Sequence, residues 1–201
     1  MTIATAAACR ILNDHRADAV VVSTMTAMKG LDAIAPEARL ALSSVPLMGG
    51  CAGLGAGLAM SRPERKILVL DGDASLLMEL GVLATVAGTG VSNFYHFVFA
   101  NGVQFNGNAN LQLSSSESVD FAACARASGY RAAWHFDDEA GFIAALPGIL
   151  AAPGPVLVQL AIEPDAPALG PGKPAPEQPD KRFERMGQEA RVIMAELGVT
   201  L

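Results

Sequence analysis

Short apolar runs alternate along the chain with segments whose apolar residues recur at helical spacing. Helical spacing occurs near 49–62, 75–89, 118–128 and 139–151. Runs rich in β-branched and aromatic residues predict six strands, at 18–24, 39–44, 66–71, 93–100, 129–136 and 154–162. Continuously apolar strands separated by helices are typical of a parallel sheet that is covered on both faces. The pattern therefore predicts an α/β fold with a doubly wound, mostly parallel six-stranded sheet and helices on both faces.

The two ends of the chain differ from this alternation. The first 18 residues lack the basic start, the apolar centre and the cleavage site of a signal peptide, and they predict an amphipathic helix. Residues 163–179 are rich in Pro and Gly and predict an extended arm, which a last helix follows near 180–197. We expect a domain at 1–162 and an arm with a helix at 163–201. That helix can clamp a partner subunit or pack on its own domain.

Composition and charge exclude several classes of protein. The chain is 51% hydrophobic with a mean hydropathy of +0.35, yet it lacks the run of about 18 uncharged apolar residues that a membrane span needs. A net charge of −6 and a pI near 5.0 argue against nucleic acid as a partner. Cys9, Cys51 and Cys124 lie far apart without zinc-ligand spacing, which fits small buried residues in a reducing cytoplasm.

Polar residues follow the apolar run at 66–71, where Asp73 stands just beyond the expected strand. Ligands of open α/β sheets bind beyond the carboxyl ends of the strands. The backbone N–H groups of Ala74 and Ser75, at the start of the next helix, can bind an anion. A cation is then needed between that anion and the carboxylate, and Mg²⁺ binds through few carboxylates plus phosphate oxygens. A helix cap and turn explains the same residues without a metal.

A second metal ligand is expected from the neighbouring strand. Asn101 follows the run at 93–100, and 26 residues separate it from Ala74. This length holds one helix and one strand, so a right-handed crossover would place Asn101 beside Asp73.

The sequence Gly72-Asp73-Ala74, followed after 26 residues by Asn101, resembles the thiamine-diphosphate motif of the thiamine-dependent decarboxylase and synthase superfamily. Ala74 stands where the motif usually has Gly. The resemblance implies that side-chain oxygens of Asp73 and Asn101 and the carbonyl of Val103 hold Mg²⁺. It also implies that the cofactor lies against these residues: Gly72, Asp73, Ala74, Ser75, Asn101 and Val103. Asp71 is interpreted as a strand-end residue.

A second stretch, "PLMGGCAGLGAGLA" at 46–59, resembles the Met-Gly turn and small-residue helix of the same superfamily. The resemblance implies that Met48 supports the bent cofactor. It also implies that the Met48 N–H and the Pro46 carbonyl bond its aminopyrimidine. The glycines alone are equally typical of a helix that packs closely on a neighbour. A dinucleotide fingerprint is disfavoured, because no acidic residue follows at the required distance.

Within the superfamily the chain resembles the beta subunit of sulfopyruvate decarboxylase and the equivalent half of phosphonopyruvate decarboxylase. This implies a beta-type subunit of a 2-oxoacid decarboxylase that uses thiamine diphosphate and Mg²⁺. The glutamate that activates the cofactor belongs to a separate pyrimidine domain, so we expect a partner (alpha-type) subunit to supply it in a hetero-oligomer. A subunit of an acetolactate-synthase-like carboligase and a catalytically silent scaffolding subunit are the alternatives.

The loop after Asn101 departs from the resembled decarboxylases, because it is rich in side-chain amides. Gln104, Asn106 and Asn108 are candidates for binding the substrate, and a polar surface loop is the competing interpretation. We expect Lys29 to be a solvated loop residue, and His96 to be a packed or hydrogen-bonded core residue.

Overall fold

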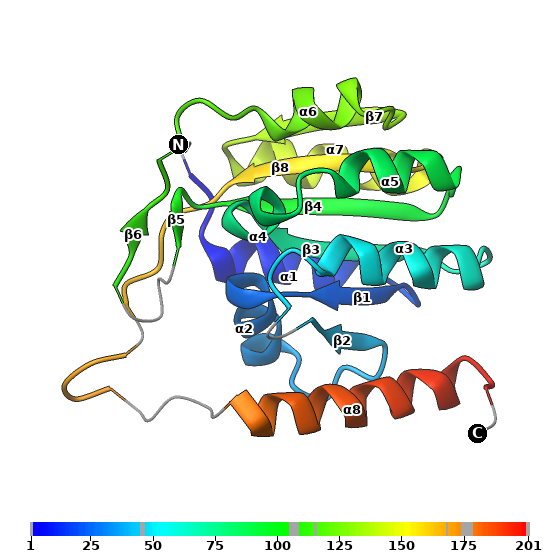
Figure 1. The fold of residues 1–201 in the computed structure, drawn as a ribbon, viewed down its shortest axis with the longest axis horizontal. Coiled ribbons are helices and arrows are strands. Elements are labelled where there is room, and N and C mark those ends of the chain that lie inside the picture. The colour runs from blue at the N-terminus through cyan, green and yellow to red at the C-terminus, as the bar shows by residue number, and fades with distance from the viewer. Residues whose placement is uncertain are drawn as a thin grey trace.

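The computed structural model describes residues 2–44, 47–104, 109–114, 116–167, 169–173 and 179–199. A six-stranded parallel sheet crosses it in the order β2-β1-β3-β4-β8-β7 (Figure 1). Its strands are β1 (Val20–Ser23), β2 (Ala41–Ser43), β3 (Ile67–Gly72), β4 (Phe94–Ala100), β7 (Ala132–Phe136) and β8 (Val156–Ala161). All six expected strands are present, and the predicted fold class is confirmed.

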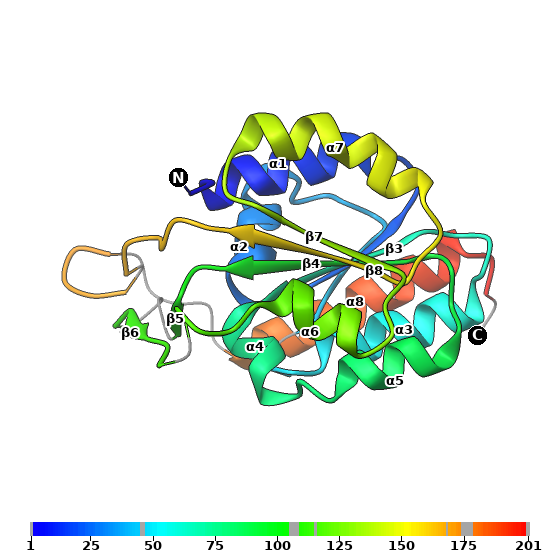
Figure 2. The same ribbon diagram turned by 90° about the horizontal axis from the view of Figure 1, so that it is seen from above.

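Helices cover both faces of the sheet (Figure 2). One face buries side chains of α1 (Thr5–His15), α2 (Met25–Ile34) and α7 (Glu139–Ala151). The other face buries side chains of α3 (Cys51–Ser61), α4 (Asp73–Met78), α5 (Val82–Thr89), α6 (Phe121–Ala127) and α8 (Pro179–Glu196). Alternate residues of each strand enter the two cores, as Leu68 and Val69 of β3 do. This explains why the strands are largely apolar on both faces. No helix in the described part of the chain combines the length and apolarity that crossing a membrane requires.

Three elements differ from the sequence-based expectation. The helix expected at 75–89 is divided into α4 and α5, which are separated by residues 79–81. The helix α2 was not expected, and it places Lys29 in a helix rather than in a loop. A two-stranded antiparallel hairpin of β5 (Val103–Gln104) and β6 (Leu111–Gln112) follows β4 at the carboxyl edge of the sheet.

The C-terminal helix α8 packs on its own domain, along the edge strand β2 (Figure 1). The carboxylate of Glu189 accepts the Ser43 N–H of that strand at 2.7 Å, which satisfies a donor that an edge strand leaves open. Arg182 and Arg185 both pair with Asp32, at 2.8 and 2.6 Å. Of the two placements that the sequence allowed, the structure therefore shows the intramolecular one.

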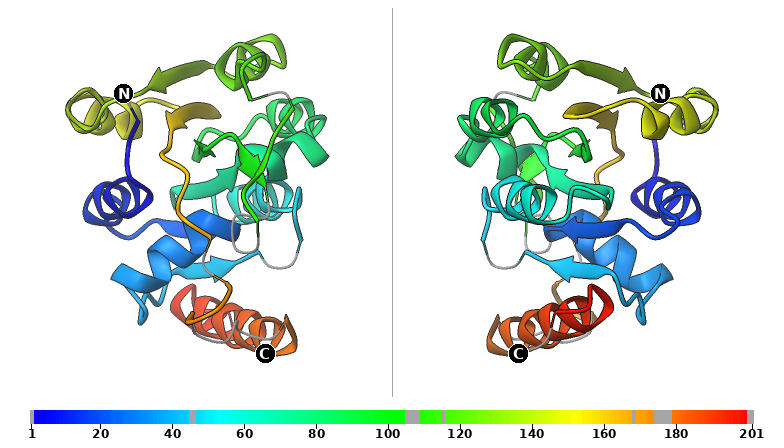
Figure 3. Two further views of the ribbon diagram at one scale, coloured as in Figure 1. Left: turned by 90° about the vertical axis from the view of Figure 1, so that its left-hand side faces the viewer. Right: turned by 90° about the vertical axis from the view of Figure 1, so that its right-hand side faces the viewer.

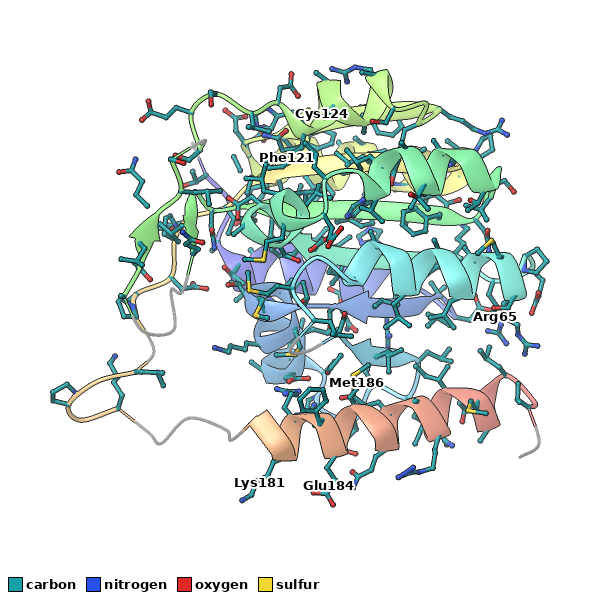
Figure 4. All side chains as sticks on the ribbon, in the orientation of Figure 1. Arg65, Phe121, Cys124, Lys181, Glu184 and Met186 are labelled. Carbon is teal, nitrogen blue, oxygen red and sulfur yellow. The ribbon has the colours of Figure 1, made fainter. Side chains whose placement is uncertain are left out.

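The two faces of α8 differ in the way that an amphipathic helix requires. Lys181 and Glu184 lie on the face turned away from the sheet, whereas Met186 points toward β2 (Figure 4). Ile193 and Leu197 are buried in the same core as β3. The helix thus closes one edge of the sheet and extends its core.

Close packing between α3 and β3 yields a test of this arrangement. A Cβ at Gly55 would lie 2.3 Å from Val69 Cγ2 and 3.2 Å from Phe94 Cε2. Gly55→Ala is therefore expected to lower the free energy of unfolding by about 1–3 kcal/mol in urea denaturation. Gly57→Ala is the control on the same helix, because nothing lies within 4 Å of its added Cβ. It is expected to stabilise by up to about 1 kcal/mol. Equal stability of the two variants would contradict the packing.

Candidate cofactor site

A pocket of about 220 Å³ lies at the carboxyl edge of the sheet, the edge that faces the viewer in the left panel of Figure 3. It draws residues from β3, β4, two helix starts, the β5 strand and the arm. Its lining is Met25, Thr26, Ala27, Lys29, Met48, Gly72, Asp73, Ala74, Ser75, Phe99, Asn101, Val103, Gln104 and Leu169. The described residues among those selected from the two sequence motifs therefore lie around one pocket.

Asp73 begins α4, directly beyond β3, and its carboxylate is buried. Its Oδ1 accepts the Ala74 N–H at 2.8 Å, and its Oδ2 accepts the Gly102 N–H at 2.7 Å. Burial raises the pKa of Asp73, and the two backbone donors oppose that rise. The Gly102 contact fixes the turn after β3 against the turn after β4, so the crossover does bring the two strand ends together.

Asn101 follows β4 and is also buried. Its Oδ1 accepts the Val103 N–H at 3.1 Å, which leaves that oxygen a second lone pair for a ligand. Between them, Gly102 adopts a φ of +69°, in the left-handed region that favours glycine. This turn lets Asn101 and Val103 line the same pocket as Asp73.

Met48 enters the pocket from the loop before α3. The next residue, Gly49, has a φ of +85°, and a Cβ there would lie 2.5 Å from Glu79 Cγ. The Gly49 N–H donates to Ser75 Oγ at 3.0 Å. Ser75 therefore ties the loop that carries Met48 to the helix that carries Asp73.

The donors at this edge fit a metal ion that needs few protein ligands. Asp73 has no Lys or Arg ion-pair partner in the described part of the chain, so no cationic side chain there balances its buried carboxylate. The described residues hold no group of three or more His, Cys, Asp or Glu that could form a protein-only metal site. One carboxylate, one amide and a backbone carbonyl suit Mg²⁺, which takes its remaining ligands from phosphate and water.

Several other predicted residues have different outcomes. Gln104 lines the pocket, whereas Pro46, Asn106 and Asn108 lie outside the described residues. Lys29 is exposed, as expected of a solvated lysine, but it also lines the pocket.

Sequence reasoning missed the part of the lining that α2 and the arm supply. Met25, Thr26 and Ala27 belong to the helix that follows β1, so the rule that ligands bind beyond strand ends could have found them. Leu169 comes from the arm, and nothing in its local sequence marks it.

A larger pocket, of about 520 Å³, lies between α2, β2 and α8. Three of its charged side chains already pair with one another, since Arg185 contacts both Asp32 and Glu189. The smaller pocket is therefore the better candidate for a cofactor.

A parallel doubly wound sheet with polar and strand-end groups around a pocket at its carboxyl edge defines a cofactor-binding α/β protein. Residues 20–160 match the model of the thiamine pyrophosphate enzyme C-terminal TPP-binding domain. The chain belongs to this family.

Curated relatives agree with this assignment. The chain is 40% identical over 146 residues to phosphonopyruvate decarboxylase of Streptomyces hygroscopicus, which covers 72% of this chain and 36% of the relative. It is 33% identical over 117 residues to sulfopyruvate decarboxylase subunit beta of Methanothermobacter thermautotrophicus, which covers 58% of this chain and 59% of the relative. The chain thus spans less than two thirds of the length of these relatives.

Solved structures support the fold. The chain is similar to a 4-hydroxybenzoylformate decarboxylase of Rhodococcus jostii RHA1, with a TM-score of 0.67 and 17% identity, over 82% of this chain and 33% of that one. A thiamin diphosphate-dependent enzyme isolated from Mycobacterium smegmatis gives a TM-score of 0.70 at 21% identity, over 81% and 32% of the two chains.

The bond between Gly49 and Ser75 can be tested by its removal. Ser75→Ala leaves the buried Gly49 N–H without its acceptor, so the free energy of unfolding is expected to fall by about 1–3 kcal/mol. Ser61→Ala is the matched control, because the exposed Ser61 hydroxyl bonds the Gly57 carbonyl within its own helix. The control is expected to change stability by no more than about 0.5 kcal/mol. Thermal unfolding of both variants checks the difference, and equal losses would contradict this role of Ser75.

Proposed function

We propose that this chain is the beta-type subunit of a 2-oxoacid decarboxylase that uses thiamine diphosphate and Mg²⁺. One observation supports it most. Asp73 and Asn101 are both buried, stand at the ends of adjacent strands and line one pocket, which Met48 also lines. Membership of the thiamine pyrophosphate enzyme family supports the cofactor, and the named relatives support decarboxylation.

The residues at the strand ends would hold the metal and the diphosphate. Asp73 and Asn101 would give side-chain oxygens to Mg²⁺, and Val103 would give its carbonyl. The turn of Gly72, Ala74 and Ser75 would lie against the diphosphate. When bound, thiamine diphosphate supplies the carbon nucleophile and electron sink that allow a 2-oxoacid to lose CO₂.

Met48 would orient the cofactor by supporting its bent conformation. The Met48 N–H and the Pro46 carbonyl would bond the aminopyrimidine. In this proposal residues 1–162 form the cofactor-binding domain, and residues 163–201 form the arm and helix. Leu169 of the arm lines the pocket, so the arm helps to exclude water from it.

The substrate we propose is a small 2-oxoacid that carries a second anionic group, as sulfopyruvate and phosphonopyruvate do. Gln104, Asn106 and Asn108 would offer amide donors to it. Lys29 is the one Lys or Arg among the described lining residues, and it supplies a positive charge that amides lack.

A partner subunit completes the site in this proposal. Two relatives are named as beta subunits of sulfopyruvate decarboxylase. The glutamate that activates the cofactor would come from an alpha-type chain with a pyrimidine domain. Two exposed apolar residues lie near the motif residues. Leu47 directly precedes Met48, and Met78 lies on the same helix as Asp73. Both are suited to apolar contact with that chain.

Removal of the carboxylate tests the metal site. Asp73→Ala is expected to weaken Mg²⁺-dependent binding of thiamine diphosphate by about 100-fold or more, because loss of even an outer-shell partner costs about 10- to 100-fold. Titration calorimetry measures the binding, and circular dichroism confirms the fold. Asp14→Asn is the matched control, since Asp14 is exposed on α1. Wild-type binding by Asp73→Ala would contradict the proposed ligand.

Partner dependence requires a separate experiment. The chain alone, supplied with Mg²⁺ and thiamine diphosphate, is expected not to release CO₂ from pyruvate, sulfopyruvate or phosphonopyruvate. Co-expression with the alpha-type subunit is expected to restore turnover and to bury about 2,000 Å² or more in the complex. Sustained decarboxylation by the purified chain, with no second polypeptide on a gel, would contradict the subunit proposal. Carboligated products from the complex would favour the carboligase alternative.

A further inference from the structure

A chain of three buried polar side chains lies beneath the turn that carries Asp73. Asp71 of β3 and His96 of β4 are both fully buried, and Tyr130, which precedes β7, is 5% exposed. His96 Nε2 lies 3.3 Å from Asp71 Oδ2, and His96 Nδ1 lies 3.3 Å from the Tyr130 hydroxyl. None of the three lines the cofactor pocket as described, so the proposed chemistry does not use them directly.

The hydrogen bonds of this array converge on Asp71. Its Oδ1 accepts the Gly72 N–H at 2.9 Å. A donor at His96 Nε2 would serve Asp71 Oδ2 and would leave Nδ1 to accept the Tyr130 O–H. Burial and the Asp71 charge raise the pKa of Tyr130, so its phenol keeps the proton that this arrangement requires. Each side chain then has a partner of the right kind.

The surroundings of the array are apolar. The Phe94 ring lies edge-on to His96 at 5.8 Å and to Tyr130 at 6.4 Å between ring centroids. Polar groups in such a place are costly to bury, and apolar side chains of the same volume often give equal stability. Stability alone is therefore a weak reason for an acid, an imidazole and a phenol to occupy this part of the core.

The array is joined to the candidate metal ligand through one peptide. Asp71 and Asp73 flank Gly72, and Asp71 holds the N–H of that residue. The carboxylate of Asp73 must at the same time meet the N–H groups of Ala74 and Gly102, and the latter follows β4. The Asp71–His96 contact links β3 and β4 by side chains, from the residue before Gly72 to the first half of β4. A shift of Asp71 would be passed on to Asp73 within two residues.

We propose that Asp71, His96 and Tyr130 form a positioning array that fixes the β3–α4 turn, so that the Asp73 carboxylate faces the metal ion. His96 and Tyr130 act through Asp71 and touch neither cofactor nor substrate. The inference rests on the proposed function, because it requires that Asp73 binds a metal.

The two tyrosines of the chain provide a matched pair for the test. Tyr130→Phe removes one hydroxyl from the array. Tyr95→Phe removes a hydroxyl on the opposite face of β4, where it donates to the carbonyls of Leu150 and Ala152. Both side chains are buried, so both variants lose a buried hydrogen bond. Only the first is expected to disturb Asp73.

The measurement is the affinity for Mn²⁺, a spectroscopic substitute for Mg²⁺, in the presence of thiamine diphosphate. The full chain is studied together with its partner subunit, and free Mn²⁺ is counted by electron paramagnetic resonance. Tyr130→Phe is expected to weaken Mn²⁺ binding about tenfold, and Tyr95→Phe less than about twofold, at similar melting temperatures. His96→Leu is expected to weaken binding by about 10- to 100-fold. His96→Gln, which keeps a donor and an acceptor, is expected to restore most of it.

The outcomes separate the positioning array from the metal site at Asp73 on which it depends. Wild-type affinity in Tyr130→Phe and His96→Leu, with affinity lost in Asp73→Ala, would overturn the positioning array and leave the metal site standing. Equal weakening of Mn²⁺ binding by Tyr95→Phe and Tyr130→Phe would show that the three side chains act only as part of the core. That result also overturns the positioning array. Wild-type affinity in Asp73→Ala would remove the metal site and this inference together.

Discussion

The Asp73 carboxylate, held between two backbone N–H groups at the edge of the sheet, is the feature on which the candidate site depends. A carboxylate taken out of water needs compensation, and the Ala74 and Gly102 donors supply part of it. Burial still raises its pKa. A divalent cation would complete the compensation and favour the charged form. The need for that cation links the local geometry to the proposed use of Mg²⁺ and a diphosphate.

The parallel sheet is what makes this geometry possible. Because β3 and β4 are adjacent and parallel, the turns that follow them meet at one edge. Gly72, the last residue of β3, pairs with Phe99, the last residue but one of β4. The same edge receives the start of α2, the Met48 loop and the arm. The outermost strand of the sheet, β2, is covered by α8. Glu189 of α8 accepts the Ser43 N–H, and Arg182 and Arg185 pair with Asp32. The candidate site and the edge cover thus use different parts of one scaffold.

Local sequence was sufficient for the sheet and for the two turns, after β3 and β4, that line the candidate pocket. Apolar runs located all six strands, and the distance from Asp73 to Asn101 located the two turns. It was insufficient for α2, a short helix that contains Gly30, and for the break between α4 and α5. Contacts made only by tertiary folding were also missed. Asp71 meets His96 across 25 positions of sequence. Leu169 reaches the pocket from an arm whose described residues form no helix or strand.

The central claim is that one metal ion joins the ends of β3 and β4 to a diphosphate. Anomalous diffraction from crystals of the complex grown with Mn²⁺ and thiamine diphosphate tests it most directly. The account predicts one anomalous peak at about 2.0–2.2 Å from an Asp73 carboxylate oxygen, the Asn101 side-chain oxygen and the Val103 carbonyl, with the diphosphate on its other side. An ordered cofactor whose diphosphate lies elsewhere, or a peak that touches neither Asp73 nor Asn101, would contradict it.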